Sequence, residues 1–161
     1  MIISFDRLAG EYVYPVSRSD VARALNAIAD QWQGKSRLKS VRFGCSRDTT
    51  REARIVQRVG ALDIRVNFCL KGWRTKDIGI TRRWKRIVLD CGGVIEKEAG
   101  TVKWDPNSAR RYAILLIYHE VAHVVYGERH GHAGLVDSRG GGAEEKWCDE
   151  WAVAAVRRHC W

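Results

Sequence analysis

The sequence predicts a single α+β domain, in which an N-terminal helix and an antiparallel sheet are followed by two further helices. Helical periodicity occurs over residues 17–34, 105–126 and 143–159, whereas strand-like alternation is confined to residues 38–104. The chain has 161 residues and is 45% hydrophobic, which is enough for one compact core. We therefore treat residues 1–161 as one domain, with a helix and sheet part over about 1–104 and two long helices over about 105–159.

The first predicted helix spans residues 17–34. Val21, Leu25, Ile28 and Trp32 recur at helical spacing and form one apolar stripe. A Ser or Asp at positions 17–20 is available to cap its first turn.

The clearest strand lies within residues 62–70, where apolar side chains alternate with polar ones. Glycines punctuate the later candidates, which favours an antiparallel meander. The other candidate strands are residues 41–45, 54–59, 86–89, 94–97 and 101–104.

A long helix is predicted to begin at Asp105-Pro106, because Pro suits the first turn and Asp caps it. It continues to about Tyr126, and Gly127 is a plausible stop. A loop over residues 128–142 ends in three glycines and is either a lid or an ordinary connection. The final helix covers residues 143–159.

The positive charge is confined to the first part of the chain. Lys and Arg number 28 against 19 Asp and Glu, for a net charge of +9, and residues 101–161 are electroneutral. Residues 35–86 hold 16 basic and four acidic side chains. Because cations and tryptophans are mixed there, this basic region suits contact with nucleic acid. A solvated basic face and an acidic protein partner are the alternatives.

Cysteine usage and hydropathy predict a cytoplasmic protein that does not associate with a membrane. No apolar run approaches the roughly 20 residues that a spanning helix needs. The five cysteines form no Cys-x-x-Cys pair, so we expect free thiols in a reducing compartment and no disulfide framework. The oligomeric state is left open.

The long helix contains His119-Glu120-Val121-Ala122-His123. Residues i and i+4 share a helix face, so both imidazoles can bind one Zn²⁺. Glu120 is then placed to act as general base on metal-activated water. The motif interrupts an otherwise apolar helix, where unpartnered polar groups would be costly to bury.

A third ligand is needed to complete a catalytic zinc site. Glu145 and Asp149 lie four residues apart on the final helix, and small Ala152 follows on the same face. We expect Glu145 to bind the metal and Asp149 to fix the orientation of a ligand histidine. The alternative is a solvated helix face that carries these acidic residues.

These residues resemble the gluzincin metallopeptidases, and the short gap between the two motifs is most similar to ImmA/IrrE-like prokaryotic and phage peptidases. The resemblance covers about residues 102–158. It implies a minimal zincin-like fold in which His119, His123 and Glu145 bind zinc. It also implies that Glu120 is the general base and that Asp149 orients a ligand histidine. Cys148, Asp149 and Trp151 depart from that family's small Ala, Asn and Phe.

A second resemblance gives a different zinc shell. His130-Gly131-His132 looks like the His-Gly pair of SprT-like peptidases, which act on DNA-bound proteins. It implies His132 as third ligand. With Glu145 as ligand, His130 or His132 would instead stabilise the oxyanion of the tetrahedral intermediate.

The expected function is therefore that of a zinc metallopeptidase acting on a protein or peptide. In zincin folds a strand beside the active helix pairs with an extended substrate, and residues 101–104 are the candidate here, although an interior strand fits them equally well. The alternative from another class is a nucleic-acid-binding module whose zinc site is structural or inactive.

Overall fold

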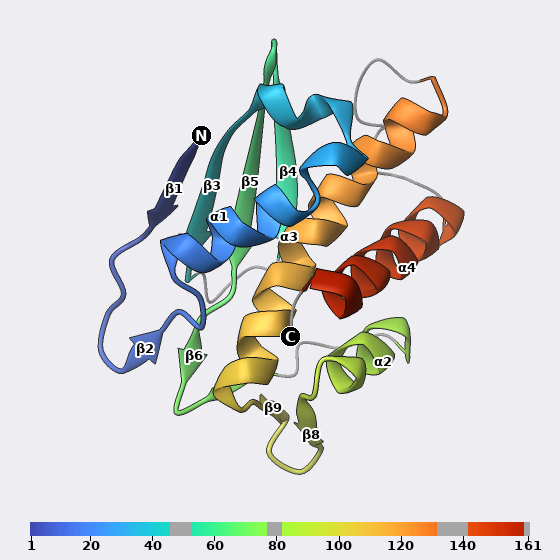
Figure 1. Ribbon diagram of the computed structural model, residues 1–161. Helices are drawn as coiled ribbons and strands as arrows, with labels where there is room; N and C mark the ends of the chain where they lie inside the picture. The colour runs from blue at the N-terminus through green and yellow to red at the C-terminus, as the bar shows by residue number, and fades with distance from the viewer. Residues whose placement is uncertain (46–52, 77–81, 132–141, 160–161) are drawn as a thin grey trace.

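The computed structural model describes residues 1–45, 53–76, 82–131 and 142–159 (Figure 1). It confirms an α+β fold, and most predicted elements are present. The helices are α1 (Arg18–Ala27), α2 (Arg82–Asp90), α3 (Pro106–Arg129) and α4 (Gly142–His159), with 3-10 turns at Ala29–Gln31 and Gln33–Arg37. The strands are β1 (Ile2–Phe5), β2 (Tyr12–Val13), β3 (Leu38–Gly44), β4 (Ala53–Arg58), β5 (Ala61–Asn67), β6 (Leu70–Lys71), β7 (Arg74–Lys76), β8 (Val94–Glu96) and β9 (Thr101–Lys103).

The strands form two sheets: the predicted antiparallel sheet is present as sheet B, and a second, mixed sheet was not predicted. Sheet A has the order β1-β3-β5-β4, with β1, β3 and β5 parallel and β4 antiparallel to β5. Sheet B is antiparallel, with the order β2-β6-β7-β9-β8. A parallel pair needs a crossover, which α1 provides between β1 and β3. Side-chain alternation has the same period in both kinds of sheet and could not reveal this direction.

Two local predictions also need correction. Residues 86–89 belong to helix α2 and not to a strand: Ile87, Val88 and Cys91 are buried and Trp84 half-buried, at the i, i+3, i+4, i+7 spacing of a helix face. The first helix ends at Ala27, before the predicted residue 34, and continues as 3-10 turns.

The cysteine prediction is wrong for two residues. Cys45 and Cys69 form a disulfide with a Cα–Cα distance of 5.5 Å, whereas Cys91 and Cys148 are free and buried. Gly44 pairs with Asn67 in the register of β3 and β5, so the two cysteines follow the same end of two neighbouring strands. Their separation of 24 residues contains no signal of this proximity. In the described part of the chain, no helix combines the length and apolarity needed to cross a bilayer.

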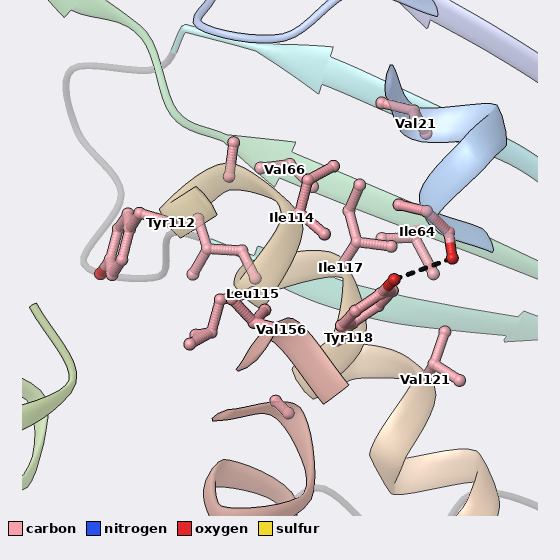
Figure 2. Close-up of a cluster of buried hydrophobic side chains, with 14 of the residues drawn as sticks. Val21, Ile64, Val66, Tyr112, Ile114, Leu115, Ile117, Tyr118, Val121 and Val156 are labelled. Carbon is pink, nitrogen blue, oxygen red and sulfur yellow. Dashed lines mark hydrogen bonds between the residues drawn. The ribbon is translucent and has the colours of Figure 1, made fainter. Parts of the chain in front are cut away.

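Helix α3 is the centre of the core and carries the site. Figure 2 shows its apolar side chains between the strands of sheet A and the end of α4. Ile114 and Ile117 are buried with Ile64 and Val66 of β5, and the Tyr118 hydroxyl donates to the Ala24 carbonyl of α1 over 2.8 Å. One helix thus packs on the sheet, on α1 and on α4, which fixes its position.

Candidate metal centre

The long helix begins as the sequence predicts. The Asp105 side chain accepts hydrogen bonds from the backbone N–H groups of Asn107 and Ser108, and Pro106 occupies the first turn. The helix then runs unbroken for 24 residues. His119 and His123 therefore keep the helical spacing on which the metal prediction depends.

The structure brings the two histidines together with Glu145 of α4. The Nε2 atoms of His119 and His123 are 3.2 Å apart, and each lies 3.5 Å from a carboxylate oxygen of Glu145. Bonds of about 2.0–2.1 Å in a tetrahedral zinc shell place neighbouring donor atoms about 3.3 Å apart. The distances from His119 and His123 end on different oxygens of Glu145, Oε2 and Oε1, and all three distances are close to this spacing. The two imidazoles and the carboxylate therefore fit zinc.

Each histidine has a buried carboxylate behind it. His119 Nδ1 lies 3.0 Å from Asp149 Oδ1, and His123 Nδ1 lies 2.8 Å from Glu144 Oε1. When Nδ1–H donates to a carboxylate, the Nε2 lone pair is left for a metal. Asp149 is where the sequence predicts it. Glu144, which is 5% exposed, was not singled out by the sequence, because its charge is typical of a solvated helix start.

The electrostatics of the cluster favour a bound cation. Burial lowers the pKa of His119, but hydrogen bonds with Asp149 and Glu145 outweigh it and raise the pKa to about 9. Without a metal, the nearby carboxylates hold a proton on this imidazole. A metal ion would displace that proton and supply the positive charge in its place.

Glu120 lies beside the two histidines and is 6% exposed. Burial is the main cause that raises the pKa of its carboxyl group, while His119, His123 and a hydrogen bond from the Ile55 backbone N–H oppose that rise. Ile55 belongs to β4, the edge strand of sheet A that packs against α3. Glu120 is thus a buried carboxylate held between the two candidate ligand histidines and a strand edge.

A second group of donors near His123 is less suited to a metal. Glu144, Cys148 and His123 lie close together, with Cys148 Sγ 3.5 Å from His123 Nδ1. Burial and the surrounding carboxylates raise the pKa of the Cys148 thiol, and metals bind the thiolate. The same Nδ1 atom is also occupied by Glu144, so this group supports the histidine and leaves the metal to the Nε2 side.

The structure describes His130, but not His132, of the two further histidines named in the prediction. His130 is exposed at the end of α3, where its Nδ1 donates to the Tyr126 carbonyl over 2.8 Å and its ring stacks on Tyr126. It forms part of neither donor group found among the described residues. His132 and the glycines at 140 and 141 lie outside the described residues, whereas Gly142 begins α4.

Of the two alternatives for residues 101–104, an edge strand that pairs with substrate or an interior strand, the structure shows the interior strand. Residues 101–104 include β9, which pairs with β7 on one side and β8 on the other, so β9 is an interior strand. The edge strand that packs against the His119 helix is β4 instead. Only the strand order, which depends on tertiary pairing, distinguishes the two.

Two features of α2 border the site. The Trp84 ring centroid lies 6.2 Å from that of His119. A cavity of about 670 Å³ between α2 and α4 extends to Asp149, and Arg86, Asp90 and Lys146 line it with both signs of charge. Helix α2, which the sequence analysis took for a strand, is therefore part of the wall around the candidate metal centre.

No protein-family model matches the chain, and no curated protein or solved structure matches it either. The resemblance to gluzincin peptidases therefore stays a prediction based on the two sequence motifs.

Glu144→Gln is expected to weaken zinc binding about 10- to 100-fold, as for other carboxylates that support a ligand histidine. The substitution keeps the size of the side chain but removes the charge facing His123 Nδ1. Competition with a chelator of known zinc affinity measures the change. The control is Glu150→Gln on the exposed face of the same helix, and equal zinc affinity in the two variants would contradict the role of Glu144.

Proposed function

We propose that the chain is a zinc-dependent metallopeptidase. The observation that supports this most strongly is the convergence of His119 Nε2, His123 Nε2 and the Glu145 carboxylate at 3.2–3.5 Å, next to buried Glu120. Three protein donors are typical of catalytic zinc sites, whereas structural sites use four. Within the described part of the chain, this donor group has three members.

His119, His123 and Glu145 would hold the metal, with Asp149 and Glu144 fixing the two imidazoles. When bound, zinc supplies a Lewis acid that acidifies water and polarises a substrate carbonyl. Glu120 would take a proton from the attacking water on its carboxylate and pass it to the leaving amine. Its burial suits both transfers, because burial raises the pKa of the carboxyl group and so brings it closer to neutral pH.

An extended peptide is the substrate form that best fits the fold. Strand β4 is an edge of sheet A beside α3, and an extended chain can join such an edge through backbone hydrogen bonds. The Ile55 N–H reaches Glu120 directly, so a peptide aligned along β4 would lie next to the base. We therefore assign to β4 the substrate-pairing role for which residues 101–104 were one candidate.

The test of this proposal is zinc stoichiometry combined with peptide hydrolysis. The purified protein is expected to hold one zinc ion per chain and to cleave a mixed peptide library, with cleavage lost on chelation and restored by zinc. Glu145→Ala is expected to lose the metal, whereas Glu150→Ala, exposed on the same helix, keeps it. Cleavage products are identified by mass spectrometry.

Two outcomes would contradict the proposal. If Glu145→Ala retains stoichiometric zinc and His132→Ala loses it, the SprT-like zinc shell replaces the gluzincin one. If the zinc-loaded protein cleaves no peptide in the library, the metal is structural or serves another reaction.

A further inference from the structure

The outer face of sheet A carries three arginines in adjacent register positions. Arg42 of β3 pairs with Arg65 of β5, and Arg65 pairs with Arg54 of β4. Their side chains therefore follow one another across three neighbouring strands on the same face of the sheet. We call these three residues the arginine row.

This face is open to solvent. Arg42, Arg54 and Arg65 are all exposed, whereas their neighbours Phe43, Ile64 and Val66 point the other way into the core. Figure 1 shows α1 and α3 in front of sheet A, on the face that carries those buried side chains. The arginine row lies on the opposite face, where no described helix covers it.

The charges of the row are only partly compensated. Asp6 accepts a hydrogen bond from Arg42 Nε over 2.7 Å, and Asp63 is engaged by Ser40 and Arg58. Among the residues that the structure describes, and with Arg58 included, four arginines face two aspartates in this part of the sheet. Like charges directly opposite one another destabilise a sheet, so the row carries a cost that bound anions would relieve.

We propose that the arginine row binds the phosphate backbone of a nucleic-acid duplex. Neighbouring strands are about 4.8 Å apart, so the three side chains start within about 10 Å of one another. A duplex carries one negative charge per about 1.7 Å of its axis and therefore offers several phosphates over that length. Arginine also matches phosphate oxygens with two parallel hydrogen bonds.

The alternatives match the row less well. An acidic peptide in extended form advances about 3.3 Å per residue and turns every second side chain away, so it brings fewer charges to the row. Single strands are normally bound by stacking on aromatic side chains. None of the described register neighbours on this face is aromatic: they are Ser4, Ser40, Gly44, Val56, Asp63 and Asn67. Contact with the backbone alone predicts binding without sequence preference.

Duplex binding at the arginine row does not depend on the proposed peptidase activity. Within the basic region over residues 35–86, the row is one defined location on the fold. The fold distributes that region over sheet A, sheet B and α2, and the row is the part where the register places arginines side by side.

The experiment measures binding of the full chain to a fluorescent duplex of about 20 base pairs at several salt concentrations. The triple variant Arg42→Gln, Arg54→Gln, Arg65→Gln is expected to lose affinity for the duplex about tenfold or more. The slope of log binding constant against log salt concentration is expected to become shallower by about 2–3. The matched control replaces Arg18, Arg23 and Arg158, three exposed arginines of α1 and α4, with Gln. It changes the net charge equally and is expected to stay within about twofold of wild type.

Circular dichroism and thermal unfolding establish that the row variant folds, and removal of adjacent like charges is expected not to lower its stability. Equal losses in the row and control variants would overturn the proposal, because net charge alone would then explain binding. Tighter binding to a single strand, to polyglutamate or to vesicles with anionic headgroups than to the duplex would also overturn it.

Discussion

Glu120→Gln is expected to retain zinc and to lose peptide hydrolysis by about two to four orders of magnitude, the usual contribution of a general base. Glutamine keeps the shape of the side chain but cannot accept a proton from water. The proposed ligands His119, His123 and Glu145 are untouched. Zinc content and the rate of cleavage of a peptide found in the library screen are measured on the same preparation.

Glu128→Gln is the matched control for this prediction. Glu128 lies two turns further along α3, where it accepts backbone hydrogen bonds from Gln33 and Gly34. Its loss affects the packing of a 3-10 turn and should leave hydrolysis close to wild type. If Glu120→Gln hydrolyses peptide as fast as wild type, Glu120 is not the base. If Glu120→Gln loses its zinc together with hydrolysis, Glu120 has a structural role in the site.

The second large effect concerns the core that holds the active helix. Ile117→Ala is expected to lower the free energy of unfolding by about 2–5 kcal/mol, the range for removing a large apolar side chain from a closed core. Ile117 is fully buried, and Figure 2 shows it on α3 among the side chains of sheet A. Chemical denaturation of the metal-free protein measures the change.

Ile2→Ala provides the control, because Ile2 is 69% exposed on β1 and should change stability by less than about 0.5 kcal/mol. Zinc is expected to stabilise wild type and Ile117→Ala by similar amounts, since Ile117 packs away from the two histidines. A loss below about 1 kcal/mol in Ile117→Ala would contradict the packing of α3 on the sheet.

The candidate zinc ligands were predictable because their geometry is local. His119 and His123 are separated by one helical turn, and Asp105-Pro106 fixes where that helix begins. Glu145 and Asp149 share a helix face by the same rule. Their proximity to the histidines could therefore be predicted from one assumption, that the final helix packs against the long helix. These inferences needed only the 3.6-residue period and the chemistry of the side chains.

The features that the sequence missed all depend on which segments become neighbours. Glu144 resembles any exposed helix-start acid until α4 packs on α3 and turns it toward His123. The Cys45–Cys69 disulfide and the arginine row require the parallel register of β3 and β5. Helix α2 was the exception, because Trp84, Ile87, Val88 and Cys91 contain the helical spacing that a short apolar run concealed.

By itself, the sequence determined the α+β class, the long capped helix and the set of residues able to bind a metal, because each follows from periodicity and side-chain chemistry within one segment. The tertiary structure decided the direction of the strands, the identity of the edge strand beside Glu120 and the carboxylate behind each histidine. Side-chain alternation records which face of a strand is buried, but it does not record which strand lies next to it or in which direction that neighbour runs.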